Sequence, residues 1–308
     1  MQLLVLGSSA GGGFPQWNCN CDQCRAVRGG SPTHRARTQS SIAVGGPDDW
    51  LLINASPDIL TQLQRNPQLQ PARALRDSGI AGVLLCDGQV DHSTGLYMLR
   101  ERGRPLPLWS TRPVHEDLSQ GNPILRVLGH YCGVDWRELP FDGRAITVPG
   151  VDGLRVTPLS LSSKPAPYSP HRECPVDGDN VGLLLENTAS GRRIFYAPGL
   201  GEITPPVWEM MLAADTVLVD GTFWTDDEMI RLGLSSKTAR DIGHLPQSDL
   251  PDGTPGMRTM LSRLPAATRK ALIHINNTNP ILDEASPQRR ELSAAGIEVC
   301  HDGLVFEF

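Results

Sequence analysis

The sequence contains no apolar run that approaches the roughly 20 residues of a membrane-spanning helix. It also contains no basic stretch interleaved with aromatic residues, and its formal net charge is -6. Because nucleic-acid-binding faces carry clustered Lys and Arg, this balance argues against a nucleic-acid partner. We therefore expect a soluble protein whose partners include neither a membrane nor a nucleic acid.

An export signal is missing as well. The apolar segment Met1–Gly7 is too short for the core of a signal peptide and has no basic region before it, so it is typical of a first strand. The seven cysteines form an odd set, and three of them lie between Cys19 and Cys24. This distribution favours a metal site over a disulfide framework, and the cytoplasm is the expected compartment.

No tandem repeat and no low-complexity linker divides the 308 residues. Apolar strand-like runs occur in both halves of the chain and alternate with helical patterns. We predict one α/β domain over residues 1–308, built from two sheets with outer helices and a Cys-rich metal loop near 19–24. The predicted strand groups are 39–44 with 50–54, 181–186 with 193–197, and successive antiparallel strands over 136–161.

The stretch after the apolar run Ile80–Leu85 carries the most informative residues. The run is typical of a buried strand, and a helical pattern follows it, with Ser93 or Thr94 as the N-cap. Asp91 and His92 lie between the two, where α/β proteins place their ligand chemistry. They offer an oxygen and a nitrogen to one divalent metal, although an N-cap Asp beside a solvated His has the same pattern.

Two further buried strands end in residues of the same kind. Asp220 follows the apolar run Thr216–Val219, and His274 follows Ala271–Ile273. Three strands that each stop at an acid or a His favour convergence on one metal site over independent helix caps and a core His. The predicted ligands of this active-site metal are Asp91, His92, Asp220 and His274.

Three thiols lie close together in a predicted loop, at Cys19, Cys21 and Cys24. Such short spacing lets sulfur atoms converge on one soft, tetrahedral ion. A set of sulfur ligands leaves no position for a substrate, so we predict a structural zinc, with unligated buried thiols as the alternative. The fourth ligand must come from elsewhere in the chain.

Several weaker candidates remain. The segment Ser162–Asn180 has four prolines and no periodicity, and loops of this length are usually functional. Within it, His171 is a candidate ligand or substrate contact, or a solvated side chain. His244 is a candidate acid, base or ligand. The turn Gly11–Gly13 matches no phosphate-binding spacing and is expected to bring backbone close to the site. The polar run His274–Pro280 directly follows a buried strand, so it needs hydrogen-bonding partners at a metal or in a turn.

Seven segments spread along the chain carry a family resemblance. They are GGGFPQWNCNC at 11–21, NASPDI at 54–59, PARALRD at 71–77, YSPHR at 168–172, APGLG at 197–201, VDGT at 219–222 and HINNTNP at 274–280. With these the sequence resembles the metallo-β-lactamase superfamily and, within it, the pyrroloquinoline quinone (PQQ) biosynthesis protein B family. The resemblance implies a four-layer αβ/βα sandwich with metal ligands at strand ends.

The dinuclear motif of that superfamily, His-x-His-x-Asp-His, is incomplete here. Asp87 and Gln89 replace the two leading histidines, while the Asp-His pair that ends at His92 remains. The later Asp220 and the final His274 match the superfamily's other ligands. The resemblance therefore implies one metal instead of a bridged pair. Two histidines and a carboxylate with open positions are typical of non-haem Fe(II) and oxygen chemistry.

A related phosphodiesterase branch carries the same Cys triad as a structural zinc site. Its fourth ligand is a His three residues after the last active-site His. Asn277 occupies that position here, so the resemblance carries over only to the three cysteines.

For function, the resemblance implies iron- and O2-dependent hydroxylation of the tyrosine ring of a Glu–Tyr-derived PQQ precursor. His244 and His171 become the candidate catalytic, proton-handling residues, with Fe(II) at the active site and zinc at the cysteines. The expected partners are the small-molecule or peptide-derived precursor and other PQQ biosynthesis proteins; the oligomeric state stays open. Two alternatives also stay open: a carrier in transport of PQQ or its precursor, and a metal-dependent hydrolase with a second metal held by Asp87 or His171.

Overall fold

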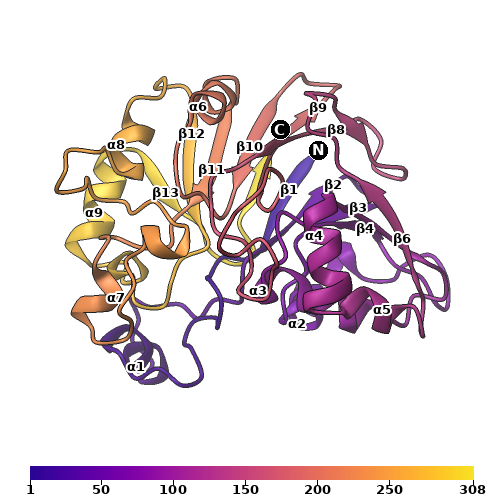
Figure 1. Ribbon diagram of the computed structural model, residues 1–308, viewed down its shortest axis with the longest axis horizontal. Coiled ribbons are helices and arrows are strands. Elements are labelled where there is room, and N and C mark those ends of the chain that lie inside the picture. The colour runs from indigo at the N-terminus through magenta and orange to yellow at the C-terminus, as the bar shows by residue number, and fades with distance from the viewer.

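In the computed structural model, which describes residues 1–308, two seven-stranded sheets lie face to face with helices outside each (Figure 1). The first sheet has the order β14 (Val305–Glu307), β1 (Gln2–Gly7), β2 (Ser41–Gly45), β3 (Trp50–Ile53), β4 (Ile80–Leu84), β5 (Leu106–Ser110), β6 (Val134–Glu138). The second has the order β13 (Ile297–Val299), β12 (Arg269–Ile273), β11 (Thr216–Asp220), β10 (Arg193–Ala197), β9 (Val181–Asn187), β8 (Leu154–Ser160), β7 (Ile146–Thr147).

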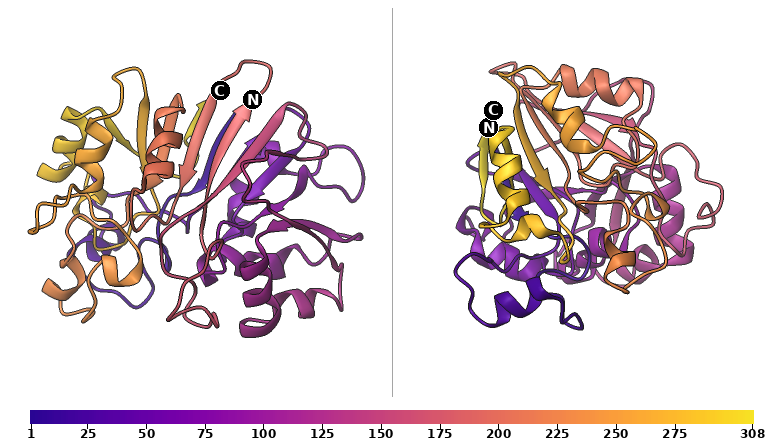
Figure 2. Two further views of the ribbon diagram at one scale, coloured as in Figure 1. Left: turned by 45° about the horizontal axis from the view of Figure 1, so that its top comes forward. Right: turned by 90° about the vertical axis from the view of Figure 1, so that its left-hand side faces the viewer.

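The helices complete the four layers. Those on the side of the first sheet are α2 (Ile59–Arg65), α4 (Arg112–Glu116) and α5 (Ile124–Leu128), and those on the side of the second are α6 (Pro205–Leu212), α8 (Met257–Ser262) and α9 (Pro287–Ala294) (Figures 1 and 2). The others are α1 (Asp22–Arg28), α3 (Val90–Ser93), α7 (Glu228–Arg231), the π-helix Asp117–Gly121 and the 3₁₀-helices Pro67–Leu69, Thr94–Leu99, Arg240–Ile242 and Pro280–Leu282. None of the helices has the length and apolarity needed to cross a bilayer. The predicted αβ/βα sandwich is confirmed.

Alternation along the strands explains the layers. In β1, Leu3 and Val5 are buried between the sheets, while Leu4 and Leu6 are buried beneath the outer helices. In β11, Leu218 faces the first sheet and its neighbours face the helices of the second. Because side chains alternate along a strand, a sheet that is covered on both faces needs apolar residues at every position.

The sheets are joined at the end where the predicted metal ligands lie. Strands β3 to β6 run parallel, as do β10 to β13, so their carboxyl ends share one edge in each sheet. The chain that leaves β1 ties the two edges together, because Ser9 bridges both Gln39 and Ile275. The backbone N–H of Ala10 also donates to Ile275 O at 2.9 Å. This junction sets the ends of β4, β11 and β12 around one cavity.

Most predicted strands are present, and three features differ from the prediction. The pairs β2–β3 and β9–β10 are antiparallel as predicted. The expected antiparallel run over 136–161 is wrong at its start, since β6 pairs in parallel with β5 before the chain crosses to the second sheet. The helix expected to be capped by Ser93 or Thr94 already begins at Val90. The C-terminal β14 pairs with β1 and is too short to show a periodicity.

Candidate metal centre

The turns after β4 and β12 bring three potential ligand atoms together. Asp91 Oδ2 lies 3.3 Å from His274 Nε2 and 3.7 Å from His92 Nε2. Both histidines are buried, and His92 Nε2 has no hydrogen-bond partner. A buried nitrogen without a hydrogen-bond partner is rare because it costs free energy. A cation bound between this nitrogen and the carboxylate would remove that penalty. The donor set therefore fits a single metal ion approached from the cavity side.

The other ring nitrogen of each histidine is held by the protein. His92 Nδ1 donates to Asp87 and lies 2.9 Å from each carboxylate oxygen. His274 Nδ1 lies 2.9 Å from Thr222 Oγ1. These contacts fix the rings so that both Nε2 atoms are presented to the cavity, as the supporting partners of metal-binding histidines do. Asp87 therefore supports a ligand from the position where the superfamily motif has a His.

Backbone geometry adds to this placement. His274 has a φ of 60°, a left-handed conformation that costs a non-glycine residue free energy. The Thr222 hydroxyl, which donates to Asp220, packs against this residue and lies 2.8 Å from His274 O. On the opposite side, a Cβ at Gly11 would lie 3.2 Å from Asp91 Oδ2. The glycine turn therefore brings backbone against the site, as the sequence predicted.

Asp220 lies behind this group with its carboxylate fully engaged. Its Oδ2 accepts from His244 Nδ1 at 2.6 Å and from Leu200 N at 2.9 Å, and its Oδ1 accepts from the Thr222 backbone and side chain. The His244 ring stacks on that of His274, with 5.4 Å between centroids. The structure thus groups Asp220 with His244 and His274, and the direct metal ligation predicted for Asp220 stays a prediction.

The electrostatics of the site favour added positive charge. Burial by itself would lower the pKa of His92, but Asp87 and Asp91 raise it to about 9. Burial would likewise raise the pKa of Asp91, but the adjacent His92 and His274 hold it well below its usual range. The pKa of His244 is raised against the effect of burial, chiefly by Asp220. The same surplus of negative charge attracts a divalent cation.

A cavity of about 290 Å³ opens above these ligands. Besides the ligands, it is lined by Phe223, Asn276, Lys164 and Arg172. Neither of the two cations has an ion-pair partner. Neither Lys164 nor Arg172 is predicted from the sequence as a site residue, although their loop stands out by its prolines and its lack of periodicity. His171 lies outside the lining and bonds instead to the carboxylate of Asp179.

The three cysteines form a second group at a distance from the cavity. Their sulfur atoms all lie within 4.8 Å of one another, a spacing that one ion with bonds of about 2.3 Å can bridge. The expected loop is partly helical, because Cys24 lies in the first turn of α1. Asn277 faces the group, with its Nδ2 3.4 Å from Cys24 Sγ. The segment from His274 to Asn277 therefore links the two candidate metal sites.

Comparison with known proteins gives consistent matches. A family model for the β-lactamase superfamily domain matches residues 49–275. The chain is 62% identical to coenzyme PQQ synthesis protein B of Azoarcus sp. (strain BH72) over 306 residues, or 99% of each chain. It is 55% identical to the protein of the same name from Methylococcus capsulatus, again over 99% of each.

Solved structures show the same relationship. The crystal structure of Zn²⁺-bound PqqB from Methylobacterium extorquens superimposes with a TM-score of 0.89 at 38% identity, over the full length of both chains. A diphosphatase of the PhnP family gives a TM-score of 0.65 at 19% identity, with all of this chain and 96% of that one covered. The latter shares the fold alone.

Proposed function

Since this chain belongs to the coenzyme PQQ synthesis protein B family of the β-lactamase superfamily, we propose that it catalyses iron- and O2-dependent hydroxylation of the tyrosine ring of a Glu–Tyr-derived PQQ precursor. Family membership gives the chain a role in PQQ synthesis, and the specific reaction is our proposal. The observation that supports it is the group of Asp91, His92 and His274, with Asp87 turned to a supporting role. A two-metal hydrolase needs a second set of ligands. The other group here, Asp220, His244 and His274, shares His274 with the first and has its Asp220 carboxylate engaged by protein donors.

In this proposal Asp91, His92 and His274 hold the iron. Fe(II) with open coordination positions supplies the redox chemistry that inserts an oxygen atom from O2 into an aromatic ring. One oxygen atom enters the ring and the other leaves as water, with two electrons from an external reductant. Zinc, which the M. extorquens relative binds, is proposed for Cys19, Cys21 and Cys24.

The remaining cavity residues bind and orient the precursor. Phe223 offers an aromatic surface to the ring, and it meets the His244 ring edge-on with 5.9 Å between centroids. Lys164 and Arg172 have no ion-pair partner of their own and are suited to the precursor's carboxylates. His244, whose Nδ1 is fixed by Asp220, has its other ring nitrogen for proton transfer at the cavity.

The test is a mass spectrum of the product after anaerobic loading with Fe(II) and exposure to O2, a reductant and the precursor. Wild-type protein should add one oxygen atom, and Asp91→Ala or His274→Ala should abolish the addition. His130→Ala, on the exposed surface, is the matched control and should retain it. A cleaved precursor would instead support the hydrolase, and a precursor returned unchanged but tightly bound would support the carrier.

A further inference from the structure

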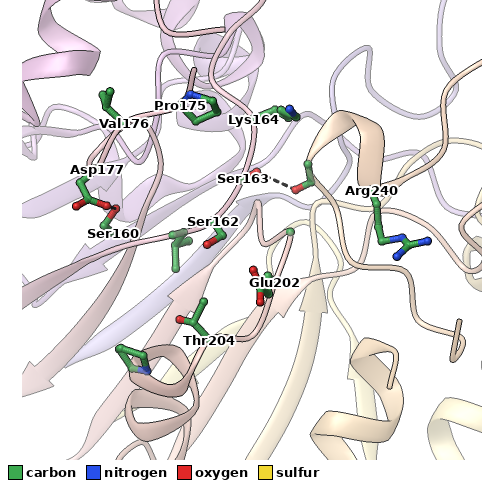
Figure 3. Close-up of a pocket in the computed structure, with 14 residues that line it drawn as sticks. Ser160, Ser162, Ser163, Lys164, Pro175, Val176, Asp177, Glu202, Thr204 and Arg240 are labelled. Atoms are coloured by element: carbon green, nitrogen blue, oxygen red, sulfur yellow. Dashed lines mark hydrogen bonds between the residues drawn. The ribbon is translucent and has the colours of Figure 1, made fainter. Parts of the chain in front are cut away.

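A second, larger cavity of about 610 Å³ adjoins the metal cavity and is unused by the proposed reaction (Figure 3). Ser163 and Lys164 line both cavities and therefore form the wall between them. The rest of the outer cavity is polar, with hydroxyl groups and charges of both signs and few apolar side chains. Such a lining is unsuited to an apolar ligand and suited to a small, charged one.

The wall between the cavities is held rigidly by two glycine-containing loops. Ser163 Oγ donates to Gly243 O at 2.8 Å, and Gly201 N donates to Ser162 O at 3.1 Å. A Cβ at Gly243 would lie only 2.7 Å from Lys164 N, so the contact requires glycine. Lys164 is thus placed by close backbone packing and not left to a mobile loop.

Lys164 is also distinctive in its chemistry. Of the 28 cationic side chains in the sequence only three are lysines, and the other two are Lys237 and Lys270. The Lys164 side chain makes no ion pair and donates no hydrogen bond within the protein. Arg240, the other cation of the outer cavity, lies 3.3 Å from Asp226 and 3.6 Å from Asp252. Lys164 is therefore the cation available to a ligand.

Two carboxylates without ion-pair partners line the outer cavity on the sides away from Lys164. Figure 3 shows Glu202 across the cavity from Lys164, with Asp177 on a third side. Glu202 forms no ion pair and no hydrogen bond, and Asp177 accepts only from the Ser160 hydroxyl, at 3.3 Å. A purely anionic ligand would be repelled by these carboxylates, and a purely cationic one by Lys164 and Arg240.

We propose that the outer cavity is a subsite for a zwitterionic α-amino-acid end of the substrate. Lys164 receives the α-carboxylate, and Glu202 receives the α-ammonium group. This inference rests on the proposed function, because a precursor made from Glu and Tyr carries such ends on the ring that the metal cavity holds. The subsite selects amino-acid-bearing aromatics over simple phenols, which lack both charges.

The test is equilibrium binding by calorimetry, with the Glu–Tyr-derived precursor as the probe and Zn²⁺-loaded protein, in which no turnover occurs. Lys164→Met and Glu202→Gln should each weaken binding about tenfold, because each removes a charge-assisted contact. Lys237→Met and Asp48→Asn remove exposed charges elsewhere and should leave the dissociation constant unchanged. A precursor with acetylated amino groups should bind wild type weakly and should no longer respond to Glu202→Gln.

Two results would overturn the subsite. If the precursor binds and is hydroxylated but neither Lys164→Met nor Glu202→Gln changes its affinity, the outer cavity holds only solvent. If Lys164→Met alone weakens binding, Lys164 acts in the metal cavity and the amino-acid subsite is wrong. If binding depends on both Lys164 and Glu202 but the Fe(II)-loaded protein adds no oxygen, the proposed function fails and the subsite stands, so the two failures are distinguishable.

Discussion

Asp87 illustrates how one residue can change the chemistry of an inherited site. It stands where the superfamily motif has a histidine, and its carboxylate accepts a hydrogen bond from Nδ1 of His92. Asp87→Asn should weaken metal affinity about 10–100-fold, because the amide is a poorer acceptor for that ring N–H and leaves the ligand less basic. Competition against a chelator measures this. Asp48→Asn, which is exposed, is the control, and equal affinities for the two variants would contradict the supporting role.

Glu228 gives a pH dependence away from the metal ligands. Burial raises its pKa from 4.5 to about 7, although Thr278 Oγ1 and Trp224 N donate to it. Between these values the folded protein keeps a proton that the unfolded chain has released, so the free energy of unfolding falls as pH rises and levels off above about pH 7. The total fall is about 3 kcal/mol.

Glu228→Gln removes that slope, because an amide does not ionise. Denaturant unfolding at about pH 8 should show the variant to be more stable than wild type, with the difference vanishing toward about pH 4.5. Glu209→Gln, an exposed charge, should behave as wild type. A wild-type slope that persists in Glu228→Gln would assign the pH dependence to another group.

Among single residues, the sequence predicts the candidate ligands better than it predicts the residues that surround them. Asp91, His92 and His274 follow apolar runs, so their place at strand ends is visible in the pattern. Lys164 and Arg172 lie in an irregular loop that has no periodicity to place them. Their positions depend on long-range contacts such as Ser163 to Gly243, which local sequence does not encode.

Among the elements, the polar run after β12 contacts both candidate metal sites. His274 belongs to the metal centre, Asn277 faces the cysteines, and Asn279 Nδ2 donates to Gly221 O at 2.9 Å. The sequence indicated that this run needs hydrogen-bonding partners, and it has them at both sites. Its precise partners could not be predicted, because they come from the turn after β11 and from α1, which are distant in sequence.

The cysteine group should stabilise this region through zinc. Cys21→Ser should lower the zinc content by one ion per chain and lower the free energy of unfolding. A metal ion that binds only the folded state, at a free concentration of about 1,000 times its dissociation constant, raises the free energy of unfolding by ~4 kcal/mol. Metal analysis and thermal unfolding measure both effects. Cys174→Ser, an exposed thiol, is the control. Unchanged zinc and stability in Cys21→Ser would show that the sulfurs hold no structural ion.

Over the whole molecule, one apolar core connects the two sheets. It includes Val5 and Ile53 from the first sheet and Leu183 and Leu218 from the second. The layered fold was predictable because doubly covered strands are apolar throughout. Details such as β14 depend on pairing between the two ends of the chain, which lie side by side (Figure 1).

This shared core predicts one cooperative unfolding transition, as expected for a single domain. Circular dichroism and tryptophan fluorescence should give coincident denaturant curves. Leu183→Ala should shift the whole curve by about 2–5 kcal/mol, since the side chain is fully buried. Leu75→Ala, at an exposed site, should change little. Two separate transitions, with only one affected by Leu183→Ala, would indicate two independent units.

In the proposed reaction, the oxygen atom added to the precursor comes from O2 at the metal centre. The most direct measurement is mass spectrometry of the product from Fe(II)-loaded protein turned over under isotopically heavy O2 in ordinary water. The added oxygen should carry the heavy label, and Asp91→Ala should form no labelled product. Oxygen drawn from water, or a cleaved precursor without label, would contradict the hydroxylase and favour hydrolysis.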